Sequence, residues 1–281
     1  MTQTLIIMAA GASSRMKSSV STTLEATTIA QANSRTKGLI EIGDNHKSLL
    51  YYLLCNAQKA GYKKVYLIIG ADFLFFKSII EKLPDLELLE FIFVIQRIPD
   101  GRSKPLGTAD AILQAVDQFP DLKKIHFSVC NSDNLYSVKA FQNLRKIEIN
   151  HGLIAYDINY LDFSIEKLSS FGILVFNSEF ILVKILEKPS VSEIKKLKKQ
   201  KNVYVSMNCF TFNGATFYPF LKQCPIHPIR NEKELPLAVS NMIEASSEKV
   251  LVIPMQQHVP DLTIKEDILH IKNYLVSRNL D

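Results

Sequence analysis

The segment Leu5–Ser19 reads LIIMAAGASSRMKSS. Its apolar start predicts a buried strand over residues 4–8, and small residues around Gly11 follow, then Arg15. Small side chains let backbone N–H groups approach an anion closely, and arginine adds a forked, permanently charged donor for phosphate oxygens. The loop matches neither the Walker A motif nor GxGxxG. By itself it predicts either a phosphate-binding loop or an ordinary turn after a strand.

Short apolar runs alternate with helical patterns through the first half of the chain. Strands are expected at 64–70, 91–96 and 124–130, and helices at 47–61, 73–84, 108–119 and 137–149. Strands separated by helices predict βαβ units with right-handed crossovers and a mostly parallel sheet. We therefore expect an α/β fold with helices on both sides of a central sheet.

The pattern changes after Gly152, because several strands follow one another without a helix between each pair. Strands are expected at 152–158, 171–176, 203–212 and 249–255, helices at 214–224, 234–245 and 264–278, and a basic helix or loop at 192–201. A mixed sheet is predicted for this half. The segment Ser18–Ser34 is rich in Ser, Thr and Ala, and it predicts either a mobile loop or a short inserted helix.

The composition is that of a globular protein, with 47% apolar and 22% charged residues among 281. This balance excludes a wholly disordered chain, and a net charge of +5 is too small and too dispersed to indicate nucleic-acid binding. The four cysteines lack zinc spacing, so reduced and mostly buried thiols are expected. Neither a signal peptide nor a membrane span is indicated, which favours a cytoplasmic protein that does not bind membranes.

Three further segments carry polar side chains at the expected edge of the sheet. Lys37 follows the Ser/Thr-rich segment and either reaches back over the phosphate loop or lies on the surface. Gln96 ends a strand, and its amide offers both a donor and an acceptor to the edge of a base. Gly107 would let a flat base pack against the backbone, while Thr108 either joins that site or caps the helix that begins there.

Asp133 follows a buried strand directly. Burying an isolated carboxylate is costly, so such an aspartate is usually hydrogen-bonded or holds a metal. A hard oxygen ligand suits Mg²⁺, which combines one or two carboxylates with phosphates and waters; a turn or helix cap is the alternative. Glu187-Lys188-Pro189 and the pair Pro260-Asp261 add carboxylates and a lysine that indicate nothing in isolation.

Taken in order, MAAGASSRM, Lys37, GTADAI, NSDNLY, EKP and VPDLT resemble the sugar-1-phosphate nucleotidyltransferases, the nucleotide-sugar pyrophosphorylases that include glucose-1-phosphate thymidylyltransferases. The resemblance spans nearly the whole chain. It implies a Rossmann-like (GT-A-like) nucleotidyltransferase fold in one domain, residues 1–281, with a nucleotide-binding half (1–150) and an acceptor-binding half (151–281). A homo-oligomer is compatible with the family.

The resemblance implies a Mg²⁺-dependent reaction in which a nucleoside triphosphate and a sugar 1-phosphate give a nucleotide-sugar and pyrophosphate, typically for surface polysaccharide or glycolipid assembly. The acceptor phosphate attacks the α-phosphorus in line. Such a transfer depends on positioning and charge neutralisation more than on covalent help from the protein.

The resemblance also assigns roles to individual residues. Those for the nucleotide are the backbone of Ala9, Ala10, Gly11 and Ser14, Arg15 for the β- and γ-phosphates, Lys37 near the α-phosphate, and Gln96, Gly107 and Thr108 around the base. Those for the acceptor are Gly172, Glu187 for hydroxyls, Lys188 for the phosphate, and Asn208. Mg²⁺ would be held by Asp133 and Asp261, and the catalytic set is Arg15, Lys37 and Asp133.

Departures from the family pattern leave alternatives open. The segment between Arg15 and Lys37 is longer than expected and could form a lid, and the segment 156–172 is unusual, which leaves the acceptor open. A cytidylyltransferase for a phospho-alcohol such as phosphocholine would need an aromatic or acidic cage. A glycosyltransferase would commonly show D-x-D where Ser132-Asp133-Asn134 stands. A sensor that binds nucleotide without turnover would not need the charged residues.

Overall fold

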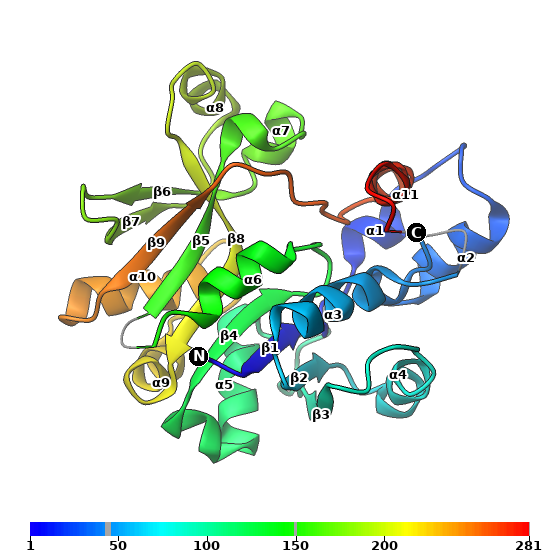
Figure 1. The fold of residues 1–281 in the computed structure, drawn as a ribbon, viewed down its shortest axis with the longest axis horizontal. Helices are drawn as coiled ribbons and strands as arrows, with labels where there is room; N and C mark the ends of the chain where they lie inside the picture. Colours follow the sequence, from blue (N-terminus) through cyan, green and yellow to red (C-terminus); the bar gives the residue numbers. More distant parts are fainter. Residues whose placement is uncertain (43–45, 149–150, 281) are drawn as a thin grey trace.

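A computed structural model of the protein describes residues 1–42, 46–148 and 151–280. Within these residues a nine-stranded sheet forms the centre of the protein (Figure 1). Its main path has the order β3-β2-β1-β4-β8-β5-β9, while β6 pairs with β8 and β7 with β6. The strands are β1 (Thr4–Met8), β2 (Lys64–Ile69), β3 (Glu90–Ile95), β4 (His126–Asn131), β5 (His151–Asp157), β6 (Gly172–Phe176), β7 (Leu182–Leu186), β8 (Tyr204–Asn213) and β9 (Val250–Met255).

All of these strands except β7 and β8 run in one direction. β1 to β4 pair in parallel, β8 is antiparallel to β4, β5 and β6, and β9 is parallel to β5. The expected mixed, mostly parallel sheet is therefore confirmed. One strand, β7, was not expected: in its five residues LVKIL only the first and fourth are buried, so its apolar pattern matches no simple strand alternation.

Helices cover both faces of the sheet. They are α1 (Ser14–Ser18), α2 (Ala26–Ser34), α3 (Leu49–Ala60), α4 (Phe73–Ile80), α5 (Thr108–Gln118), α6 (Val138–Arg145), α7 (Ile165–Leu168), α8 (Val191–Leu197), α9 (Gly214–Gln223), α10 (Leu235–Ala245) and α11 (Lys265–Ser277). The expected helices are confirmed within a few residues at their ends. The helix expected at 137–149 ends at Arg145, and its last expected residue lies outside the described residues.

The alternation of β1 shows how the two layers form. Leu5 and Ile7 pack with apolar residues of α3, α6 and α11 on one face, and Ile6 and Met8 pack with those of α5, α9 and α10 on the other. Because successive side chains of a strand point to opposite faces, a strand that is apolar throughout must be covered on both sides. β1 is accordingly buried along its whole length.

The Ser/Thr-rich segment contains the short helix that was one of its two expected conformations. α1 ends at Ser18, a turn follows, and α2 begins at Ala26. In Figure 1 this segment lies at the same end of the molecule as α1 and α11. The Gln31 side chain of α2 accepts hydrogen bonds from the Glu41 N–H and the Arg35 guanidinium, both at 3.0 Å, which ties the inserted helix to the chain that follows it.

The cysteines of the described chain are unpaired. Cys130, Cys209 and Cys224 are buried, Cys55 is half-buried, and all four are free, which confirms the expected reduced thiols. Across residues 1–42, 46–148 and 151–280, none of the helices has the length and apolar character needed to cross a membrane.

His151 gives the fold a predictable sensitivity to acid. Its ring is fully buried, with Nε2 3.1 Å from a Glu248 carboxylate oxygen and 3.1 Å from the Thr216 hydroxyl. Burial lowers the pKa of His151 to about 4, although the nearby charge of Glu248 acts to raise it. Burial also lowers the pKa of His126 and of His258. Between pH 6.5 and 4 the unfolded chain therefore binds more protons than the folded chain.

We predict that the free energy of unfolding falls as the pH is lowered from 7.5 to 5, where most carboxylates are still ionised. The His151→Gln variant should lose less stability over this interval, because its side chain does not titrate. Urea unfolding at the two pH values measures both differences. Equal losses in the wild type and the variant would contradict the assignment to His151.

Candidate functional site

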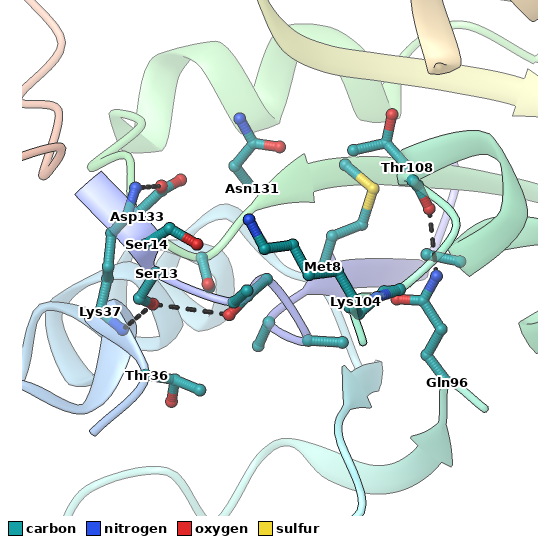
Figure 2. A pocket seen from close by; sticks show the side chains of 18 of the residues that line it. Met8, Ser13, Ser14, Thr36, Lys37, Gln96, Lys104, Thr108, Asn131 and Asp133 are labelled. Carbon is teal, nitrogen blue, oxygen red and sulfur yellow. Dashed lines mark hydrogen bonds and ion pairs between the residues drawn. The ribbon is translucent and has the colours of Figure 1, made fainter. Parts of the chain in front are cut away.

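Two adjoining cavities lie at the carboxyl edge of the parallel strands, where ligands of open α/β sheets bind. The first, of about 380 Å³, is bounded by the loop after β1, by Gln96 after β3 and by the start of α5 (Figure 2). The second, of about 220 Å³, lies toward β6 and β8. The wall that both cavities share consists of Arg15, Thr108, Asn131, Asp133, Asn208 and Glu232.

The register of the sheet explains why the loop after β1 and the segment after β4 meet. β1 and β4 pair in parallel with Met8 opposite Asn131, so both strands end at the same level. The Ser132 N–H then donates to the Met8 carbonyl at 3.2 Å. The loop after β1 and Asp133 therefore leave the sheet side by side.

The loop from Ala9 to Ser14 presents its backbone to the first cavity. A Cβ at Gly11 would meet no atom within 4 Å, so the chain's own packing does not require a glycine there and the space beyond it is open to a ligand. Ser13 has a left-handed conformation (φ 54°), and its hydroxyl accepts from the Lys37 N–H at 3.2 Å. This bond joins the loop to the residues that follow the inserted segment.

Lys37 and Asp133 form an ion pair in the wall of the first cavity. The Lys37 Nζ lies 2.8 Å from Asp133 Oδ2, and Figure 2 shows the two side chains meeting beside Ser13 and Ser14. The pair is largely shielded, since the side chains are 13% and 24% exposed. Backbone packing holds it: a Cβ at Gly38 would lie 3.2 Å from the Ser132 carbonyl oxygen, so these two segments touch closely.

Asp261 is brought beside Asp133 by a short antiparallel pairing. The Leu262 N–H donates to the Asp133 carbonyl at 2.8 Å, and Asn134 forms a bridge with Asp261. Both Asp133 and Asp261 line the second cavity. The arrangement places both expected aspartates on the wall of one cavity.

The surroundings of Asp261 keep it ionised. Its carboxylate accepts from the Asn134 amide at 2.8 Å and the Thr263 hydroxyl at 2.5 Å, and it pairs with Lys167 at 2.9 Å. Burial raises the pKa of Asp261, but the charge of Lys167 and the bond from Thr263 offset this, so that its pKa lies below the ordinary value.

The oxygen ligands that Asp133 and Asp261 offer are of the kind that Mg²⁺ prefers. Among the residues with described positions, no group of three or more His, Cys, Asp and Glu side chains gathers at one point. Mg²⁺ does not need such a cage, because it is usually held by one or two carboxylates together with substrate phosphates and waters. In the described part of the chain Asp133 Oδ1 accepts no hydrogen bond. Two carboxylates, one of which has an oxygen that accepts no hydrogen bond from the described residues, therefore fit this ion.

The orientation of the Gln96 amide is fixed by its surroundings. Its nitrogen donates to the Gly107 carbonyl at 3.1 Å and to an Asp110 carboxylate oxygen at 3.0 Å. An ionised carboxylate and a carbonyl can only accept hydrogen bonds, so both amide hydrogens are used there. Gln96 can therefore offer only its carbonyl oxygen to a ligand in the first cavity, which it lines.

Gly107 and Thr108 have roles within the fold as well as positions in the first cavity. Gly107 has a positive φ of 115°, and a Cβ there would collide with the backbone of Lys233, so the chain's own packing requires glycine. The Thr108 hydroxyl accepts from the Leu235 N–H at 2.9 Å. It therefore satisfies a donor at the start of α10, and gives no side-chain cap to α5.

The second cavity contains three of the four residues expected for the acceptor, Gly172, Glu187 and Asn208. A Cβ on Gly172 would lie 2.6 Å from Glu187 Oε1, so only a glycine at position 172 leaves room for this carboxylate in its present position. Lys188 is the one expected site residue that lines neither cavity. It lines a separate depression beside β7 and α8.

Arg230 is a cation of the second cavity that sequence reasoning did not find. It pairs with Glu187 at 3.4 Å and with Glu234 through its other terminal nitrogen. Glu232 and Lys167 were also missed. These residues stand in loops and a four-residue helix without periodic patterns, so nothing in the sequence around them indicates which side of the fold they occupy.

The comparisons with known proteins agree with this geometry. The sequence profile described as "Nucleotidyl transferase" matches residues 5–257. A crystal structure of UDP-glucose pyrophosphorylase complexed with UDP-glucose superposes with a TM-score of 0.72, at 15% identity, over 99% of this chain and 100% of the other. The apo form of a UDP-glucose pyrophosphorylase gives 0.70, at 15% identity, over 100% of both chains. None of the curated protein sequences matches.

At this identity the two solved structures establish the fold, and the expected Rossmann-like nucleotidyltransferase fold is confirmed. The family profile covers most of the chain, from β1 to the end of β9 and beyond. The chain belongs to the nucleotidyl transferase family.

Proposed function

We propose that the protein transfers a nucleotidyl group from a nucleoside triphosphate to a sugar 1-phosphate, with release of pyrophosphate. The observation that carries this proposal is the wall shared by the two cavities, which contains Arg15 and Asp133. A nucleotide in the first cavity and a phosphorylated acceptor in the second would meet at that wall. On this account residues 1–150 mainly hold the nucleotide and residues 151–281 mainly hold the acceptor.

The triphosphate would lie along the loop after β1. The backbone of Ala9–Gly11 and of Ser14 would surround it, and Arg15 would neutralise the β- and γ-phosphates. An oxygen of the acceptor phosphate forms a bond to the α-phosphorus, while the bond from that phosphorus to the α–β bridging oxygen breaks and pyrophosphate departs. Lys37 would neutralise charge that develops at the α-phosphate.

Asp133 and Asp261 would hold Mg²⁺. When bound, the ion supplies positive charge to the phosphate oxygens and so lowers the repulsion between two anionic substrates. The ammonium groups of Lys37 and Lys167 balance the two carboxylates in the protein itself.

The base would be recognised through the Gln96 carbonyl oxygen. Because Asp110 and Gly107 take both amide hydrogens, the base must offer an N–H group at this point. Thr108 borders the same cavity at the start of α5. Asp110 would therefore influence the choice of base without touching it.

The acceptor would lie among Gly172, Glu187 and Asn208, with Glu187 accepting bonds from its hydroxyls. Arg230 is the cation already directed into this cavity and would bind the acceptor phosphate. The role of Lys188 stays a prediction, and it would require that side chain to turn away from the depression beside α8.

A second candidate acceptor is supported by the acidic character of the second cavity. Glu187, Glu232 and Glu234 all line it, and Phe171 supplies an aromatic ring. Such a lining also suits a phospho-alcohol that carries a cationic group, such as phosphocholine. Nucleotidyl transfer at the same wall would be common to both candidates.

Pyrophosphate release will test the proposal. Each of the common nucleoside triphosphates should be incubated with Mg²⁺ and with a panel of sugar 1-phosphates, including an amino sugar, and with phosphocholine. We expect at least one sugar 1-phosphate to give pyrophosphate and a nucleotide-sugar, and EDTA to stop the reaction reversibly. Turnover with phosphocholine alone would select the second candidate, and a folded sample inactive with every pair would contradict both.

Lys37→Ala should lower kcat far more than it weakens nucleotide binding, because the lysine is assigned to charge that develops in the transition state. A loss on the order of 100-fold in kcat is expected for one such donor. Steady-state kinetics with the active pair measures the effect, and Lys124→Ala, at an exposed ion pair, is the matched control. A higher KM with unchanged kcat would contradict the assignment.

Asp110→Asn should reduce discrimination between bases, because an asparagine amide can also donate and so permits the Gln96 amide to turn over. We expect the ratio of kcat/KM between the preferred and the next nucleotide to fall by about 10-fold, the equivalent of about 1.4 kcal/mol. Asp117→Asn, on the exposed side of the same helix, is the control. An unchanged ratio in Asp110→Asn would exclude base recognition through this network.

A further inference from the structure

Lys265 is a buried cation without a carboxylate partner. Its side chain opens α11 and is 2% exposed, and it is the only lysine or arginine among the buried residues of the described chain. No ion pair involves it in the residues that the structure describes. Its Nζ instead donates to the backbone carbonyls of Met16 (2.8 Å), Lys17 (3.3 Å) and Ser19.

These three carbonyls belong to the last turn of α1 and the residue after it. The carbonyls at a helix C-terminus lack partners within the helix and carry partial negative charge. An ammonium group has three hydrogens, and here each has a carbonyl to meet. Taking an unpaired charge out of water is costly, and these three hydrogen bonds offset that cost for Lys265. An apolar side chain at this position would leave the three carbonyls without this donor.

α1 depends on such external contacts because it has only five residues. A helix of this length is not stable alone in water. At its start the Ser13 hydroxyl accepts from the Lys37 N–H, and in its middle Met16 is fully buried. Lys265 holds its end, and the Lys265 N–H also donates to the Ser19 hydroxyl at 3.1 Å. The helix is thus fixed at both ends and in its core.

The position of α1 matters because it presents Ser14 and Arg15 to the first cavity. Lys265 stands four residues after Asp261 in the chain. The contact between Lys265 and the carbonyls of α1 therefore joins α1 to the segment that carries a candidate Mg²⁺ ligand. Lys265 also stands where the inserted segment leaves α1, at Ser19.

We propose that Lys265 is a positioning residue for triphosphate binding: by holding the carbonyls at the end of α1, it keeps Arg15 and the loop after β1 in the arrangement that receives the phosphates. This inference rests on the nucleotide site of the proposed function. Lys265 itself does not touch the substrate, since it lines neither cavity.

Inorganic tripolyphosphate is the probe that tests this role, because its binding depends on neither the base nor turnover. Lys265→Met removes the charge and the three donors while keeping an unbranched side chain. We expect this variant to bind tripolyphosphate on the order of 10-fold more weakly than the wild type, as measured by calorimetric titration. Hydrogen exchange of residues 14–19 should become faster, because the end of the helix is no longer held.

Lys17→Met is the matched control, because Lys17 is an exposed lysine on the same helix. It removes one positive charge near the site and should weaken tripolyphosphate binding by less than 3-fold, roughly the effect of a screened surface charge. An affinity of Lys265→Met equal to that of the wild type, or lowered no more than that of Lys17→Met, would overturn the proposal.

Lys265→Gln keeps the test decisive if the methionine variant does not fold. Its amide retains two of the three donors, so an intermediate affinity for tripolyphosphate is expected, and an unchanged affinity would overturn the positioning role. Wild-type protein that binds tripolyphosphate but transfers no nucleotide would contradict the proposed function while leaving the role of Lys265 intact.

Discussion

The parallel pairing of β1 with β4 is the constraint on which the site depends. Because Met8 stands opposite Asn131, both strands end at one level of the sheet, and the loop around Gly11 emerges beside Asp133. The ion pair between Lys37 and Asp133 then joins that edge to the residue that follows the inserted segment. A shift of either strand by one residue would turn its side chains to the opposite face and separate these groups.

A second property of the site is that its charges are held in place by one another. Lys37 is paired with Asp133, Lys167 with Asp261, and Arg230 with Glu187. Side chains that are already oriented lose little freedom when a ligand binds. Phosphoryl transfer relies on positioned charge, so a fold that fixes opposite charges around two adjoining cavities suits this chemistry. Lys265 extends the same principle to the backbone, because it fixes the helix that carries Arg15.

The sequence predicts the parts of this protein that depend on local pattern. The apolar run Leu5–Met8 of β1 and the helical spacing of α3, which is followed by Gly61 with φ 95°, are visible in the residues themselves. The polar residues that follow β1, β3 and β4 could be assigned to one edge because parallel strands bring their carboxyl ends together. Gly107 shows a limit of such reasoning. Its close contact with the backbone of Lys233 already requires glycine at this position, so the glycine alone does not indicate a ligand.

What could not be predicted depends on contacts between distant segments. Lys265 and the carbonyl of Met16 are 249 residues apart, and the partners of Arg230 lie on a strand end and a helix start that only the folded sheet brings together. Lys188 illustrates the reverse case, because its neighbour Glu187 lines both the second cavity and the depression beside β7 and α8, while Lys188 lines only the depression. The backbone turns at Lys188, which has a left-handed conformation with φ 48°, so a motif of consecutive residues does not ensure a shared site.

In the proposed reaction the two cavities allow a single in-line displacement at the α-phosphorus, with protein groups that position and neutralise but form no covalent intermediate. The stereochemical course of the reaction distinguishes this displacement from a two-step transfer. The active nucleotide, carrying sulfur in place of one α-phosphate oxygen in a single configuration, is converted with its acceptor, and the product configuration is determined by phosphorus NMR. A single displacement gives inversion at phosphorus, which is the expected result; retention would require two successive displacements and would contradict the proposed reaction.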